Sequence, residues 1–227
     1  MNSQPHRATQ EQILQFMTTE HFTLQTARAA TVAEANGRST LYLGSVSSAV
    51  VALAFIGQVS GMSGPFFLFG IVLFPSLFFL GVVTFARVHQ TGLEDMIHAL
   101  EISRIRHYYV EVAPEAAPYF LHSTHDDVAG FFHDMGAAPS WFQYFLTTSG
   151  SVAVINSVIA GVFAGMLARF ALEMPAYFGA GLGIAVFSAS VIAHGRYQSI
   201  RSMKVVNRLQ PLFPRSGPVV DRESARR

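Results

Sequence analysis

Residues 65 to 86 read PFFLFGIVLFPSLFFLGVVTFA and contain no charged side chain. A helix of this length is about 33 Å long, enough to cross the roughly 30 Å of hydrocarbon in a bilayer. Another charge-free run, LYLGSVSSAVVALAFIGQV, occupies residues 41 to 59, and only SGMSG separates the two. The pair predicts a transmembrane helical hairpin with a tight turn.

A second pair of apolar runs follows further along the chain. GSVAVINSVIAGVFAGMLA covers residues 150 to 168 and PAYFGAGLGIAVFSASVIA covers residues 175 to 193, joined by RFALEM. Only 13% of the chain is charged, whereas soluble domains carry about 25%. We therefore predict an all-α polytopic membrane protein with two transmembrane hairpins (four spans) and cytoplasmic helices.

The basic residues predict the orientation of these spans. Of 15 lysines and arginines, Arg169 alone falls at a hairpin tip, so the positive-inside rule places both termini and the central segment in the cytoplasm. Arginine outnumbers lysine and alanine and glycine are abundant, which is typical of a GC-rich bacterial genome, so we expect the bacterial inner (cytoplasmic) membrane. The predicted divisions are an N-terminal cytoplasmic helix (1–40), a first hairpin (41–87), a central cytoplasmic helical segment (88–148), a second hairpin (149–194), and a basic C-terminal helix with a flexible tail (195–227).

The segments outside the apolar runs are predicted to be mainly helical. Residues 8 to 36 lack glycine and proline and carry an apolar face that needs a partner, which favours a homo-oligomer. Gly37 would allow a bend before the first span. Residues 88 to 110 form a second helix, which Pro114 and Pro118 end.

A cluster of histidines and aspartates, HSTHDD at residues 122 to 127 with His133-Asp134 after it, raises the question of a metal site. Helical metal ligands are typically four residues apart, and the position four after His125 and four before His133 is Ala129. We instead predict a helix from about 124 to 135 with Thr124 as its N-cap and aspartates in its first turn. A metal site formed through tertiary folding and a pH-sensitive cluster remain alternatives. The residues concerned are His122, Thr124, His125, Asp126, Asp127 and His133.

The central segment is acidic and the C-terminal tail is basic. The pattern is most typical of an ordinary solvated acidic face, and pairing with the basic tail of the same or a neighbouring subunit is the alternative.

Polar side chains inside the spans bear on whether the protein conducts ions. The spans hold no ionisable residue, and the candidates are Ser45 and Ser48, three apart on one helical face, and Asn156. Each could line a pore or form hydrogen bonds between helices.

Residues 26 to 55, TARAATVAEANGRSTLYLGSVSSAVVALAF, resemble the SLATT-type bacterial membrane proteins. In that family a long helix leads into a transmembrane hairpin and a cytoplasmic helix follows, and its members are suspected pore-forming effectors in nucleotide-signalled or conflict systems. The resemblance spans roughly residues 8 to 110. The second hairpin departs from the simplest two-span pattern, and no site residue is transferred.

These observations predict a homo-oligomeric channel or membrane-perturbing effector, with a non-conducting membrane scaffold or partner-binding subunit as the alternative. The chain has no cysteine and no phosphate-binding, nucleophile-elbow or zinc-protease motif, so we predict no enzyme, cofactor or metal. The expected partners are the lipid bilayer, further copies of the chain and a cytoplasmic or signalling protein. With a net charge of +1, nucleic acid is not expected.

Overall fold

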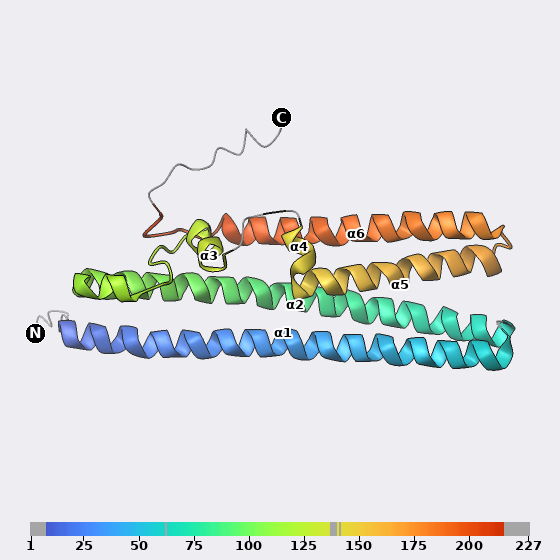
Figure 1. Ribbon diagram of the computed structural model, residues 1–227, viewed down its shortest axis with the longest axis horizontal. Helices are drawn as coiled ribbons and strands as arrows, with labels where there is room; N and C mark the ends of the chain where they lie inside the picture. The colour runs from blue at the N-terminus through green and yellow to red at the C-terminus, as the bar shows by residue number, and fades with distance from the viewer. Residues whose placement is uncertain (1–7, 62, 137–139, 141, 216–227) are drawn as a thin grey trace, which may run out of the picture. The chain divides into compact units, whose positions relative to one another are not determined.

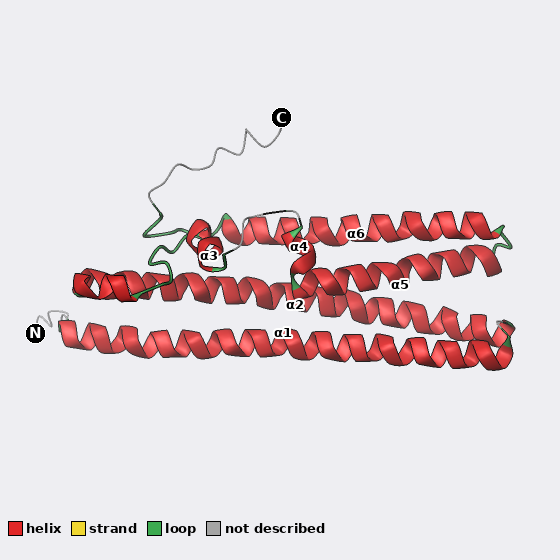
Figure 2. Ribbon diagram, in the orientation of Figure 1, coloured by secondary structure: helices red, strands yellow, loops and turns green. Residues whose placement is uncertain are grey.

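A computed structural model describes residues 8–61, 63–136, 140 and 142–215. The regular structure in this part of the chain is entirely helical, as predicted (Figure 2). Figure 1 labels the elements. They are α1 (Gln10–Ser60), α2 (Gly64–Val112), the 3-10 helix η1 (Pro114–Tyr119), α3 (Val128–Asp134), α4 (Gln143–Leu146), α5 (Thr148–Phe170) and α6 (Ala176–Val206).

Four of these helices, α1, α2, α5 and α6, are long and apolar enough to cross a membrane. Each contains one of the charge-free runs identified in the sequence. The prediction of four apolar helices in two consecutive pairs is therefore confirmed for the described residues.

The first two helices are longer than the sequence suggested. α1 has 51 residues and joins the predicted N-terminal helix to the first apolar run as one helix that includes Gly37. A glycine inside a helix costs only about 1 kcal/mol relative to alanine, which a helix of this length tolerates. α2 has 49 residues and likewise joins the second span to the helix expected at 88–110. It ends at Val112, where Pro114 prevents its continuation.

The chain divides into two compact units, which we name here. The span unit comprises residues 30–94 and 140–205, and the polar unit comprises residues 1–29, 95–139 and 206–227. Both α1 and α2 contribute one end to each unit.

The span unit buries side chains from α1, α2 and α5 in one core. Tyr42, Phe85 and Val152 are among its most buried members, and Phe74 and Ile159 pack in the same cluster. α5 and α6 approach closely at glycines, since a Cβ on Gly161 would lie 2.7 Å from the carbonyl oxygen of Gly183. Small residues of this kind allow membrane helices to pack backbone to backbone.

The polar unit has a smaller core, which includes side chains from the apolar face predicted near the N-terminus. Leu24 on α1 packs with Ile102 and Ile105 on α2, and Met17 and Tyr109 lie against them. Fully burying each such aliphatic side chain stabilises a fold by about 1.5–3 kcal/mol. The end of α2 in the same chain thus covers part of this face, while Leu14, Phe16, Phe22 and Val32 stay exposed.

Candidate functional site

The aspartates of the HSTHDD stretch begin α3, but the cap is not the residue that the sequence suggested. Asp127 is the N-cap, and its Oδ1 accepts a hydrogen bond from the Gly130 N–H at 2.7 Å. The prediction that Thr124 caps the helix is wrong, because α3 starts at Val128 rather than near 124. Ser123 Oγ accepts from the His125 N–H at 3.0 Å, which is a local turn that precedes the helix.

Asp126 binds a segment far along the chain. Its side chain is fully buried, and it accepts hydrogen bonds from the backbone N–H groups of Leu212 at 2.9 Å and Phe213 at 2.8 Å. Arg104 on α2 donates from Nε to Asp126 Oδ2 at 2.7 Å. Burial works to raise the pKa of this carboxyl, but the Leu212 and Phe213 N–H groups and Arg104 together lower it below its ordinary value.

Further contacts hold the same segment, residues 210–215, which we call the tail segment. Asp127 Oδ2 accepts from the Arg215 N–H at 2.8 Å, and Arg104 donates from Nη2 to the Gln210 carbonyl at 3.2 Å. The His107 ring stacks on Phe213 with centroids 3.7 Å apart. The acidic central segment therefore does pair with the tail, but these aspartates bind its backbone N–H groups rather than its arginine side chains.

Two histidines of the cluster, His122 and His133, lie near Asp134 rather than around a shared centre with Asp126. His122 Nδ1 and His133 Nδ1 each lie 3.6 Å from an Asp134 oxygen, and Asp134 Oδ1 also accepts from the Ser123 N–H at 2.7 Å. His125 Nδ1 is buried without a partner among the described residues. A metal site formed through tertiary folding was the alternative for this cluster, but no group of three metal-binding side chains converges within the described ranges.

A small cavity of about 120 Å³ lies beside this cluster in the polar unit. Its polar lining comes from Arg28, Ser103, Arg106, His122 and Asp134. Its apolar lining comes from Ala99, Leu100, Phe131 and Met135. Spacing along the sequence gave no signal for it, because α1, α2, the loop before α3 and α3 each supply part of the wall.

The polar side chains predicted inside the spans fall into two groups. Asn156 on α5 has no exposed surface, and the Tyr42 hydroxyl donates to its Oδ1 at 3.3 Å across to α1. Gly81 on α2 faces the same point, since a Cβ there would clash with the Asn156 carboxamide. Ser45 and Ser48 lie on α1, where Ser45 donates to its own helix at the Leu41 carbonyl and Ser48 is exposed.

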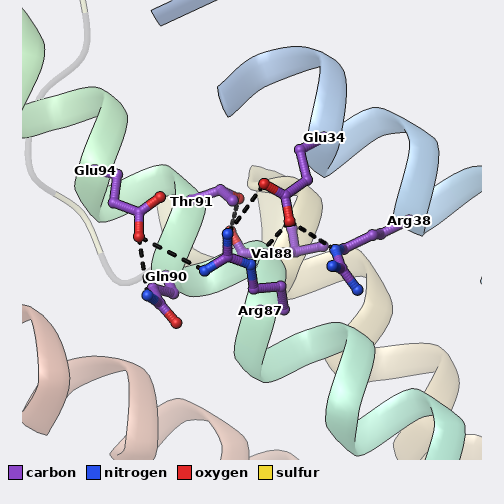
Figure 3. Close-up of polar contacts among 7 residues, drawn as sticks. All are labelled: Glu34, Arg38, Arg87, Val88, Gln90, Thr91 and Glu94. Atoms are coloured by element: carbon purple, nitrogen blue, oxygen red, sulfur yellow. Dashed lines mark hydrogen bonds and ion pairs between the residues drawn. The ribbon is translucent and has the colours of Figure 1, made fainter. Parts of the chain in front are cut away.

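An ion-pair network, which sequence reasoning missed, joins α1 to α2 just outside the first two apolar runs. Figure 3 shows Glu34 between two arginines: Arg87 donates to both of its oxygens at 2.9 and 3.0 Å, and Arg38 donates to Oε1 at 2.9 Å. Arg87 also approaches Glu94 at 3.7 Å. Hydrogen bonds from Arg87 and then Arg38 lower the pKa of Glu34 to about 2. The i,i+4 spacing of Glu34 and Arg38 was a visible signal, but only the antiparallel packing of α1 and α2 brings Arg87 to them.

No known protein family, curated protein or solved structure matches this chain.

Proposed function

We propose that the protein is a non-conducting membrane scaffold that presents the polar unit to a partner. The supporting observation is the place of Asn156. It is the most polar group in the span interiors, and it is enclosed within one chain against Tyr42 and Gly81 rather than left on an outer face. A pore formed between subunits would instead need its polar residues on a face that subunits share.

A second polar group in the apolar runs, Ser157, also forms its hydrogen bonds within one chain. Ser157 on α5 donates to Ser190 on α6 at 2.9 Å and lies 2.7 Å from the Ala153 carbonyl oxygen of its own helix. Hydrogen bonds between membrane helices contribute to packing, on average by about 0.6 kcal/mol each. These side chains thus serve the fold of the span unit.

The channel remains the second candidate because of one residue. Ser48 is exposed on α1, next to Ser47, in an otherwise largely apolar run. A homo-oligomeric channel of the kind suspected for the SLATT-type proteins would place this side chain in the pore.

Ion flux distinguishes the two functions. Liposomes that contain the purified protein should not leak potassium or chloride above the background of empty liposomes, with or without cytosolic extract. Asn156→Leu should lower thermal stability and leave flux at background. Conductance that Ser48→Leu abolishes, in a variant that keeps its oligomeric state, would establish the channel instead.

The proposed topology places both termini in the cytoplasm of a bacterial inner membrane. Cysteines substituted for Ser63 and Glu173, in the two hairpin turns, should react with an impermeant maleimide in intact cells. A cysteine at Ser123 should react only after permeabilisation. Reaction at position 123 in intact cells would contradict this arrangement.

A further inference from the structure

α5 and α6 form an open groove of about 660 Å³ on the span unit. Glycines line its base, because the two helices approach backbone to backbone there: a Cβ on Gly165 would lie 3.0 Å from the carbonyl oxygen of Gly179. The other side chains of the lining are apolar, with the exception of Arg169. Since water needs polar partners, an apolar occupant suits this groove and water does not.

The groove has the dimensions of one acyl chain. Its lining on α5 extends from Val158 to Arg169, a stretch of helix about 16 Å long. The hydrocarbon of one bilayer leaflet is about 15 Å deep, half of the roughly 30 Å of the whole bilayer. Benzene occupies a cavity of about 150 Å³, or about 25 Å³ per heavy atom, so a chain of about 16 carbons needs about 400 Å³. The groove is therefore large enough for such a chain over the depth of one leaflet.

Arg169 lies at the end of the groove beside the hairpin turn. It is exposed in the last turn of α5, and no carboxylate of the described residues, including Glu173 in the turn, forms an ion pair with it. Of 15 lysines and arginines it alone lies at a hairpin tip, where the positive-inside rule makes basic residues rare under the proposed topology. A guanidinium pairs with a phosphate through two parallel hydrogen bonds. The groove and its arginine together match the two parts of an anionic phospholipid.

We propose that this groove binds one anionic phospholipid, with the phosphate on the Arg169 guanidinium and one acyl chain along Gly165 and Ile184 toward Phe187. The inference rests on the placement of the span unit in a membrane, which is part of the proposed function. A second copy of the chain fits the groove less well. Copies of the same orientation are related by rotation about the membrane normal, so a shared groove would bring two Arg169 side chains to one depth, where like charges repel.

Photo-crosslinking tests the site with lipids that carry a diazirine at the end of one acyl chain. Phosphatidylglycerol is the anionic probe, and phosphatidylcholine with the same chains is its zwitterionic control. In vesicles that contain the full-length protein, mass spectrometry of the adducts compares labelling of Val158 and Phe187 in the groove with labelling of Val50 and Val51, which are exposed on α1. The ratio of groove to α1 labelling should be about fivefold higher with phosphatidylglycerol, the preference that one arginine at the membrane surface provides.

The outcomes separate this inference from the proposed function. Equal ratios for the two lipids would overturn the lipid site. Labelling of Val50 and Val51 without labelling of the groove would also overturn it, and would leave the membrane placement intact. Absence of labelling in every apolar run would contradict the membrane placement and the lipid site together.

Charge variants test the role of Arg169. Arg169→Gln should abolish the fivefold preference for phosphatidylglycerol, whereas Arg169→Lys, which keeps the charge, should retain most of it. Arg196→Gln removes an exposed arginine near the other end of α6 and serves as the matched control, which should leave the preference unchanged. An undiminished preference in Arg169→Gln would refute the assignment of the headgroup to this residue.

A variant that fills the groove tests its role directly. Ala180 is exposed in the lining, so Ala180→Phe places a ring in the groove, keeps every charge and should abolish the preference at Val158. Ala54→Phe, which changes an exposed alanine on α1, should leave it unchanged. Unchanged labelling of Val158 in Ala180→Phe would refute the site. Conversion of a wild-type dimer to a monomer by Ala180→Phe would also refute it, because a second copy would then occupy the groove.

Discussion

Replacing Asp126 by asparagine should release the tail segment while preserving the shape of the side chain. The aspartate accepts three hydrogen bonds, from the Leu212 N–H, the Phe213 N–H and Arg104 Nε. An asparagine has one oxygen and one NH₂ group, so one of the three donors then faces another donor. The two remaining bonds lose the assistance of the carboxylate charge.

The size of this effect follows from those three bonds. A hydrogen bond to a charged group contributes about 1.5–3 kcal/mol, and a neutral one about 1 kcal/mol. Losing one bond and weakening two others therefore costs about 3 kcal/mol. Since 1.4 kcal/mol corresponds to a factor of ten, the tail segment should open about a hundredfold more often.

Hydrogen exchange read by mass spectrometry measures this opening directly. The amides of Leu212 and Phe213 should exchange about a hundredfold faster in Asp126→Asn than in the wild type, and amides in the middle of α5 should not change. Glu115→Gln, an exposed substitution on η1 in the same unit, serves as the matched control. Wild-type exchange rates at both amides in Asp126→Asn would show that the carboxylate does not hold the tail segment.

The same contacts predict how the tail segment responds to acid. Because the folded pKa of Asp126 lies below its ordinary value, its contribution is fully present above the ordinary carboxyl range and is lost only as the pH falls through the lowered value. Exchange at Leu212, corrected for the intrinsic effect of pH, should therefore stay constant from pH 8 to pH 5. A rise in opening within that interval would point to histidine protonation instead.

The remaining predictions concern capping, packing and the ion-pair network. Asp127→Ala should lower the free energy of unfolding by about 1 kcal/mol through loss of the α3 cap, whereas Thr124→Ala should change it by less than 0.5 kcal/mol. Calorimetric unfolding in detergent compares the two variants. A larger loss for Thr124→Ala than for Asp127→Ala would show that Thr124 caps the helix instead. Gly81→Ala should lower the free energy of unfolding by about 1–3 kcal/mol through overpacking. Adding Asn156→Ala should restore part of this loss, because it removes the carboxamide that obstructs the new methyl group. Destabilisations of the two single variants that simply add in the double variant would exclude this contact. Glu34, with its pKa at about 2, should remain ionised as the pH falls from 7 to 4, and its ion pairs should weaken only near pH 2. Titration of the Glu34 carboxyl, followed by its carbon-13 chemical shift, measures this pKa. A midpoint near 4.5 would contradict the ion-pair network.

Several features of the fold could be predicted because they depend on residues close in sequence. The four apolar helices follow from runs of about 20 uncharged residues, and hydropathy is a local property. The end of α2 follows from Pro114, whose ring excludes continued helix. Helix boundaries were harder to predict, since Gly37 permits a bend without requiring one, and α1 continues through it as one helix.

The sequence by itself thus determined the helical class, the four apolar runs and which polar residues were worth attention. Only the tertiary structure decided what those residues do. Asp126 meets Phe213 and Tyr42 meets Asn156 at sequence separations of 87 and 114 residues. Periodicity and spacing carry no information about such pairs, because the path of the intervening chain sets them. From the sequence alone, a carboxylate is therefore equally compatible with capping a helix, binding a metal or holding a distant segment. The groups that the fold places around it decide between these roles.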